Sequence, residues 1–161
     1  MINRYASLAI FLLLTVLAAF AAAGFEAGSW YYVNLHKPSW APAHWLLAVA
    51  WAVAYLFAAG AAWQVWLSEH YDRVKPIVAW LVLIGMNVAW SFLYFGLHRP
   101  GWAWLLMCLA LALAVYCMAA FRRISNAAGA LMLPYVLWIA FNWALNLASW
   151  TLSGGPLSRL F

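Results

Sequence analysis

The sequence predicts an all-α integral membrane protein, a bundle of five transmembrane helices, and three observations support this fold class. Hydrophobic residues make up 70% of the 161 positions and charged residues only 7%, which is more apolar surface than a soluble domain of this length can bury. The scattered charges separate five apolar runs, each with about the 20 residues that a spanning helix needs. None of the runs alternates polar and apolar residues as the strand of a membrane barrel does.

The helices are expected where these apolar runs lie. The runs are Tyr5–Phe25, Trp45–Ser68, Pro76–Leu97, Gly101–Phe121 and a stretch within Ile124–Ser158. The predicted helices are about 5–25, 44–68, 76–97, 101–121 and 126–152, with a long first loop at 26–43. The later connectors, HYDRVK, HRP and RRISN, are short, so consecutive helices should be antiparallel neighbours. Residues 1–161 should therefore form a single five-helix domain.

The first run also has the features of a secretory signal peptide, because Arg4 precedes an apolar stretch that ends in AAFAAAG. We interpret it as a transmembrane helix. The placement of Lys and Arg then predicts the orientation, because cytoplasmic loops are enriched in both. The N-terminal side would carry five of them and the other side three: Arg4, Arg73, Lys75, Arg122 and Arg123 against Lys37, Arg99 and Arg159. This bias places the N-terminus in the cytoplasm, and the first loop and C-terminus outside, in what we expect to be a bacterial cell membrane.

Several classes of function are disfavoured by the charged residues. The net charge of +5 comes from residues scattered singly between apolar runs, so no nucleic-acid-binding surface is expected. Glu26, Glu69 and Asp72 all fall in connectors, which argues against a proton-coupled carrier. A haem iron could be ligated by His36 or His44, although an interfacial histidine can equally be a solvated polar residue. No serine-nucleophile, phosphate-binding or metal motif occurs, and we expect no required cofactor.

The stretch YYVNLHKPSWAPAHWLLAVAW, from Tyr31 to Trp51, is too aromatic and too rich in proline for a plain connector. Pro38 and Pro42 each fix one φ angle and favour an extended residue before them. A stiff aromatic loop with one lysine, Lys37, indicates a lid over a site between the helices. An interfacial belt of aromatic residues without any ligand would have the same composition.

Polar and aromatic side chains recur at helical spacing in three of the runs. They are Trp51 and Tyr55; Asn87, Trp90, Ser91 and Tyr94; and Tyr135, Trp138, Asn142, Asn146 and Ser149. Residues three and four apart share one face of a helix, and polar groups in hydrocarbon are expected to face the bundle. Three such stripes can line an apolar cavity with a few directional polar groups. The alternative is that Asn and Ser only form hydrogen bonds between packed helices.

Cys108 and Cys117 lie nine residues apart on one predicted helix, about 13 Å along its axis and about 180° around it. This separation excludes a disulfide between them. One interpretation has Cys108 facing the bundle and Cys117 facing lipid or a partner. The other is that both are small apolar packing residues.

Four motifs, in order along the chain, resemble those of one family. They are Tyr31, Tyr32, Leu35, Lys37, Pro38, Trp40, Pro42 and Trp45 in the first loop; Trp51 and Tyr55; Asn87, Trp90, Tyr94, Phe95 and Gly96; and Pro134, Tyr135, Trp138, Leu145 and Asn146. With this order and spacing the chain resembles the TspO/translocator protein family, the tryptophan-rich sensory proteins whose animal members are called peripheral benzodiazepine receptors.

The chain also departs from the family pattern. Tyr31 stands where the family usually has Trp, and Ala43 replaces the second of two prolines. Asn142 occupies a position that is usually small in the family. The segment LASWTLSGG after Asn146 lacks the tyrosine and basic pair of the weak cholesterol-recognition pattern, which argues against sterol binding there.

The resemblance implies a protein, usually a dimer, that binds porphyrins such as protoporphyrin IX and haem, and drug-like ligands of the benzodiazepine-receptor type. It implies a role in sensing or porphyrin handling, and some family members are reported to break down porphyrin in light. Transport of porphyrins or sterols is the alternative. Because no residue marks a conventional active site, catalysis stays open. The candidate ligand-binding residues are Tyr32, Lys37, Pro42, Leu47, Trp51, Tyr55, Asn87, Trp90, Ser91, Cys108, Trp138 and Asn142.

A dimer contact is also suggested by small residues in the third run. Gly85 and Ala89 are four residues apart, and they fall roughly 160–200° away from the face that carries Asn87, Trp90 and Ser91. Small residues let the backbones of membrane helices approach closely. We therefore expect a symmetric homodimer through this face, with membrane lipid around it. The alternative is that Gly85 packs against another helix of its own bundle.

Overall fold

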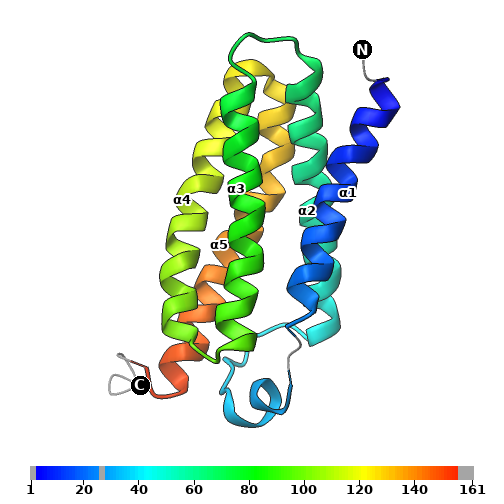
Figure 1. Ribbon diagram of the computed structural model, residues 1–161. Coiled ribbons are helices and arrows are strands. Elements are labelled where there is room, and N and C mark those ends of the chain that lie inside the picture. Colours follow the sequence, from blue (N-terminus) through cyan, green and yellow to red (C-terminus); the bar gives the residue numbers. More distant parts are fainter. Residues whose placement is uncertain (1–2, 26–27, 156–161) are drawn as a thin grey trace.

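The fold of the protein is a bundle of five long helices (Figure 1). The computed structural model describes residues 3–25 and 28–155. The long helices are α1 (Arg4–Ala23), α2 (His44–Leu67), α3 (Val74–Ser91), α4 (Pro100–Ile124) and α5 (Asn126–Leu152). Two short π-helices, η1 (Trp30–Asn34) in the first loop and η2 (Phe92–Gly96) after α3, complete the described elements. All five helices, with η2 extending α3, are long and apolar enough to cross a membrane, so the predicted fold class is confirmed.

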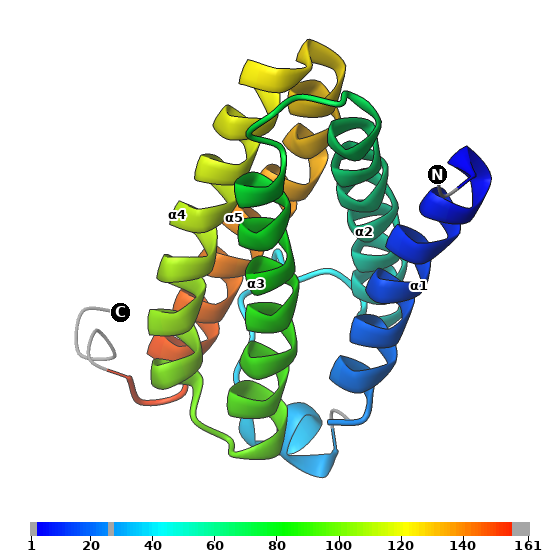
Figure 2. The same cartoon turned by 45° about the horizontal axis from the view of Figure 1, so that its top comes forward.

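The helices form a closed ring in the order α1, α2, α5, α4 and α3, and α3 returns to α1 (Figures 1 and 2). The expectation that consecutive helices are neighbours holds for α1 with α2, and for α3 with α4 and α4 with α5. Helices α2 and α3 contact each other only weakly, although a short connector joins them. Both pack mainly on other helices, and this separation leaves room for a cavity.

Helices α4 and α5 are closely joined where the chain passes from one to the other. α4 continues to Ile124, three residues beyond the predicted end, so much of the expected RRISN connector is helical. Ser125 alone joins the two helices, and its Oγ accepts a hydrogen bond of 3.3 Å from a backbone N–H of the first turn of α5. A Cβ at Gly129 would lie 2.5 Å from the Cβ of Arg122. Glycine is therefore required for the two helices to approach at this turn.

The half of the bundle near the α2–α3 connector is densely packed. The fully buried side chains there include Ala58, Ala59, Ala61, Ala62, Val65, Trp80, Leu83, Phe121, Met132, Tyr135 and Ile139. Four of these are alanines of α2, whose small side chains let neighbouring helices approach closely. Cys117 belongs to the same buried core, whereas Cys108 is only partly buried. The interpretation that Cys117 faces lipid or a partner is therefore wrong.

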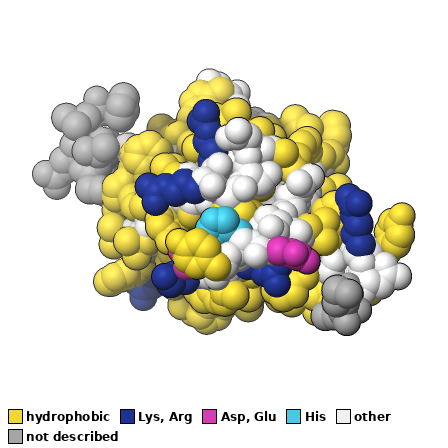
Figure 3. Space-filling model, turned by 90° about the horizontal axis from the view of Figure 1, so that it is seen from above, with side chains coloured by type: hydrophobic (Ala, Val, Ile, Leu, Met, Phe, Trp, Pro, Cys, Tyr) yellow, Lys and Arg dark blue, Asp and Glu magenta, His cyan; other side chains and the backbone are white. Residues whose placement is uncertain are grey.

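Basic side chains gather at this same end, which Figure 3 shows from above. Lys and Arg stand on several sides of the face, and acidic and histidine side chains lie nearer its middle. The guanidinium of Arg73 donates to the carbonyl oxygen of Trp66 (2.8 Å) and lies 4.7 Å from the centre of its ring. Lys75 pairs with Asp72 at 3.0 Å. Of the basic residues that define the predicted orientation, Arg159 lies outside the described residues.

The first loop folds across the opposite end of the bundle (Figure 1). The ring of Trp30 stacks on His98, after α3, with 4.6 Å between ring centres. The backbone N–H of His36 donates to Ser153 Oγ (2.9 Å), just beyond α5. Further along, the Trp40 ring packs 5.8 Å from Phe141 of α5. The loop is thus attached to two helices of the bundle, as a lid would be.

Candidate functional site: a cavity beneath the first loop

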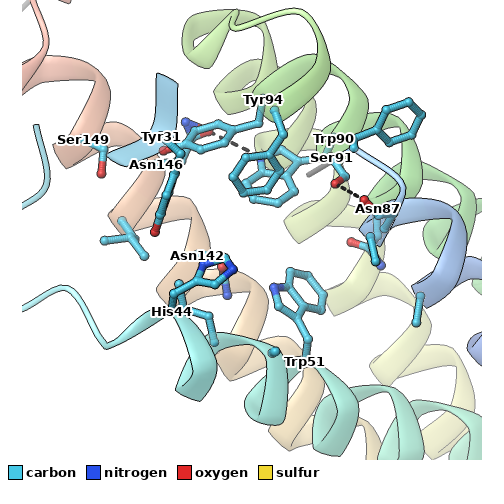
Figure 4. A pocket seen from close by; sticks show the side chains of 18 of the residues that line it. Tyr31, His44, Trp51, Asn87, Trp90, Ser91, Tyr94, Asn142, Asn146 and Ser149 are labelled. Carbon is cyan, nitrogen blue, oxygen red and sulfur yellow. Dashed lines mark hydrogen bonds between the residues drawn. The ribbon is translucent and has the colours of Figure 1, made fainter. Parts of the chain in front are cut away.

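A cavity of about 560 Å³ lies in the half of the bundle that the first loop covers. It is bounded by α1, α2, α3, α5 and the loop; α4 contributes none of its lining within the described residues. Figure 4 shows Trp51, Asn87 and Asn142 pointing into it from three different helices. This volume lies within the range typical of small-molecule sites.

The wall of the cavity is mainly aromatic. The ring of Trp51 lies 5.4 Å from Tyr55, 6.4 Å from Trp90 and 6.1 Å from Trp138, measured between ring centres. Trp51, Tyr55 and Trp90 line the cavity, whereas Trp138 stands behind Trp51 and meets it edge-on. Phe141 in turn stacks on Trp138 at 5.2 Å. The flat face of Trp51 is thus braced from outside the cavity.

The floor of the cavity carries an amide. Asn87 Nδ2 donates a hydrogen bond to the hydroxyl of Tyr135, which is fully buried below it. The Oδ1 atom of Asn87 is buried and has no hydrogen-bond partner in the part of the chain that the structure describes. An unpaired buried acceptor is costly.

The two other amides of the site are bound by their own bundle. Asn142 Nδ2 donates to the carbonyl oxygen of Trp138, one turn earlier in α5 (2.8 Å). Asn146 links two more helices: its Nδ2 donates to the carbonyl oxygen of Pro100 (3.0 Å), and its Oδ1 accepts from Trp90 Nε1 (3.4 Å). Asn146 therefore acts as an interhelical hydrogen-bonding group, the alternative interpretation of the polar stripes, whereas Asn142 bonds within its own helix.

The mouth of the cavity carries a cation held by aromatic rings. Lys37 Nζ donates to the carbonyl oxygen of Tyr31 (2.7 Å) and lies 4.0 Å from the centre of the Tyr31 ring and 5.5 Å from that of Tyr32. This is a cation–π arrangement. Partial burial lowers the pKa of Lys37 and, together with Tyr32, raises that of Tyr31. His44 lies against both tyrosine rings.

The same four side chains also border a smaller hollow of about 300 Å³ under the proline-rich part of the loop. Pro38 and Pro42 line this outer hollow. Tyr31, Tyr32 and Lys37 thus form a partition between the outer hollow and the cavity. A ligand that entered through the loop would have to displace it.

Nine of the twelve candidate residues line the cavity. They are Tyr32, Lys37, Leu47, Trp51, Tyr55, Asn87, Trp90, Ser91 and Asn142. The other three lie elsewhere: Pro42 in the outer hollow, Trp138 behind Trp51, and Cys108 on α4. The Sγ of Cys108 accepts a hydrogen bond of 3.2 Å from Trp143 Nε1, where α4 meets α5.

Sequence reasoning missed the contribution of α1. Ala19, Ala22 and Ala23 line the cavity, and Ser91 Oγ of α3 donates to the carbonyl oxygen of Ala22 (2.8 Å). These alanines carry no polar signal, and their stretch has the composition of a signal-peptide end. Further lining residues are Phe25, Tyr31, His44, Ala48, Ala52, Tyr94, Phe95, Leu145, Asn146 and Ser149. The helical spacing of the polar stripes already contained Tyr94, Asn146 and Ser149.

Within the described ranges, no group of three or more His, Cys, Asp or Glu side chains is placed to hold a metal ion. The cavity offers aromatic faces, amides, hydroxyl groups and one lysine. A bundle of five membrane-spanning helices, four of which line such a cavity, defines the class of this protein as a membrane-embedded binding protein.

Comparison with known proteins identifies the family within that class. The family model described as TspO/MBR matches residues 7–151. The chain is 35% identical to Protein CrtK of Rhodobacter capsulatus over 91% of this chain and 92% of that protein. It is 33% identical to Translocator protein of Sus scrofa (76% and 75% covered) and 30% identical to Tryptophan-rich protein TspO of Chlorobaculum tepidum (87% and 91%). The chain belongs to the TspO/MBR family, as the motifs predicted.

Proposed function

We propose that this protein binds a tetrapyrrole, such as protoporphyrin IX or haem, in the cavity beneath the first loop and acts in sensing or porphyrin handling. The observation that carries the proposal is the combination of an aromatic wall with a cationic mouth. A flat macrocycle can stack on Trp51 and Trp90, which lie 6.4 Å apart on different helices. Its propionates can then pair with Lys37 at the mouth. Drug-like ligands of the benzodiazepine-receptor type would use the same aromatic wall.

Light-dependent breakdown of the bound porphyrin is a second candidate function. The indole ring is readily oxidised by an excited porphyrin, and both Trp51 and Trp90 line the cavity. Transport across the membrane is supported less well. The cavity lies in one half of the bundle, and the other half is filled by buried side chains such as Trp80 and Tyr135. Alternating access would have to open that packed half.

The proposal also includes the setting of the protein in the membrane. The N-terminus lies in the cytoplasm, and the first loop faces the outside of a bacterial cell, because five Lys and Arg residues belong to the N-terminal side and three to the other. Two copies associate through α3. Gly85 and Ala89 are exposed, and a Cβ at Gly85 would meet nothing within 4 Å, which does not support packing of this glycine inside its own bundle.

A porphyrin titration of the purified protein tests the central claim. Quenching of tryptophan fluorescence should saturate at one porphyrin per chain in the wild type. The variant Trp102→Ala serves as control, because Trp102 lies on α4 and is 65% exposed. Saturable binding that is equally strong after Trp51→Ala would remove the cavity as the site. Product spectra after illumination of the same samples then test breakdown.

A further inference from the structure

A continuous chain of aromatic rings leads from the cavity to the surface beside the first loop. Trp51 lies 6.4 Å from Trp90, Trp90 stacks on Tyr94 at 5.0 Å, and Tyr94 meets Trp30 at 5.9 Å, all between ring centres. Trp30 then stacks on the exposed His98 at 4.6 Å. Trp90 and Tyr94 are buried, with 9% and 4% of their surface exposed. The chain therefore passes through the protein interior and ends at solvent.

Every member of this chain up to Trp30 is a tryptophan or a tyrosine, the aromatic side chains that lose one electron most readily. Electron transfer between rings becomes steeply slower with distance, and these rings are in direct contact. Other aromatic paths also leave Trp51. One runs through Tyr55 to Tyr135, which is fully buried in the packed half of the bundle. Another runs through Trp138 and Phe141 to Trp40. A phenylalanine ring is far harder to oxidise, so that path is interrupted. The path to Trp30, by contrast, contains only rings that can be oxidised, and close packing of aromatic side chains would not by itself require this.

We propose that Trp51, Trp90, Tyr94 and Trp30 form a one-electron relay that carries oxidising equivalents from a ligand in the cavity to the surface. This inference rests on the proposed function, because the oxidant is a tetrapyrrole bound against Trp51 that has lost one electron to dioxygen after excitation by light. The protein supplies the position of the rings, and the ligand supplies the light-driven chemistry.

Dioxygen takes one electron from the excited tetrapyrrole and becomes superoxide. Trp51 then gives one electron to the oxidised tetrapyrrole. Successive transfers from Trp90, Tyr94 and Trp30 restore each inner residue, so that the electron deficit ends on Trp30. Tyr94 releases its hydroxyl proton when it is oxidised and regains a proton when Trp30 reduces it. The indole N–H of Trp30 releases its proton to water and leaves a neutral radical. This radical combines with the superoxide and one proton to give a hydroperoxide of Trp30, the net addition of one O₂.

The relay explains how the tryptophans that line the cavity can remain intact although they lie beside a light-activated oxidant. The damage is transferred to Trp30, which does not line the cavity. A soluble thiol can alternatively reduce the Trp30 radical by donating a hydrogen atom, which leaves a thiyl radical. In that case Trp30 is restored and the site is ready for another cycle.

The test is to map oxygen addition by mass spectrometry after illumination of the porphyrin-loaded protein without added thiol. Trp45 and Trp102 are internal controls, because they are 68% and 65% exposed whereas Trp30 is half-buried. Oxygen species that diffuse through solvent would oxidise these two controls first. The relay instead predicts that Trp30 is oxidised before either of them.

Two variants separate the relay from simple proximity. In Trp90→Phe, oxidation of Trp30 should fall to the level of the controls, because the connecting ring is present but hard to oxidise. In Trp30→Phe, oxidation should stop at Tyr94 or Trp90, while porphyrin binding stays at the wild-type level. Oxidation of Trp30 that is unchanged in Trp90→Phe at saturating porphyrin would overturn the relay.

Binding is measured in each sample before illumination by fluorescence quenching. If the wild type binds no porphyrin, the proposed function fails and the relay fails with it. If it binds porphyrin and oxygen is added mainly at Trp45 and Trp102, the relay alone is refuted.

Discussion

Replacement of Trp51 by alanine is the most direct perturbation of the proposed site. Its ring contacts Tyr55, Trp90 and Trp138, and it lines the cavity. Stacking of a base on an aromatic side chain contributes about 1–3 kcal/mol, and we expect a similar contribution for a porphyrin ring. Since 1.4 kcal/mol corresponds to a factor of ten, affinity should fall about 5- to 150-fold.

Trp51→Ala should remain folded, and replacements of Trp80 and Trp138 serve for comparison. Trp51 is partly exposed to the cavity, so its truncation enlarges an existing space. By contrast, Trp80 is fully buried in the packed half, where a Trp→Ala change should cost about 3–5 kcal/mol. Trp138→Ala should reduce affinity less than Trp51→Ala, because Trp138 only supports the Trp51 ring from behind.

The assay is a porphyrin titration in detergent or nanodiscs, with the helical content of each variant checked by circular dichroism. Trp102→Ala corrects for the loss of one fluorophore. Equal dissociation constants for wild type and Trp51→Ala, with both proteins folded, would refute the stacking argument. A larger loss in Trp138→Ala than in Trp51→Ala would show that the ligand lies outside the cavity described here.

Three further predictions concern the loop and the dimer. Lys37→Ala should weaken binding of a porphyrin diacid more than of its diester, and equal losses in two parallel titrations would make Lys37 a membrane anchor instead. Burial lowers the pKa of Lys37. The preference for the diacid should therefore hold below that pKa and be lost as pH rises through it, at a lower pH than for an ordinary lysine. A preference that persists at high pH would contradict the ion pair. Gly85→Leu combined with Ala89→Leu should give monomers by light scattering that still bind porphyrin, and a dimer that persists would exclude this face.

Much of the fold followed from apolar length and charge, and the site followed from periodicity only in part. All four residues of the stripe on α3 and η2 line the cavity. Of the stripe on α5, Asn142, Asn146 and Ser149 line it, whereas Tyr135 and Trp138 do not. Spacing fixes relative angles around a helix but not the rotation of the whole helix. For this reason the sequence did not predict that Cys117 is the fully buried one of the two cysteines.

Depth along the bundle was also beyond the reach of the sequence. Trp138 lies on the same helix as Asn142, yet its ring stands behind Trp51 rather than in the cavity. Helix α1 joins the wall through alanines, which resemble ordinary lipid-facing residues in the sequence. The departure of α2 from α3 results from packing of both helices on other partners, and a short connector gives no sign of it.

The division of the bundle into a packed half and a hollow half bears on how a bound ligand could be sensed. The packed half is fixed by fully buried residues such as Ala58, Trp80 and Tyr135, so ligand binding has little room to rearrange it. Within the first loop, Lys37 is held on Tyr31, and the loop is attached to the bundle by contacts such as the stacking of Trp30 on His98. An anionic ligand group that attracts Lys37 weakens its hold on Tyr31. The loop, on the side of the membrane opposite the basic end, is therefore the element through which occupancy of the cavity would reach a partner.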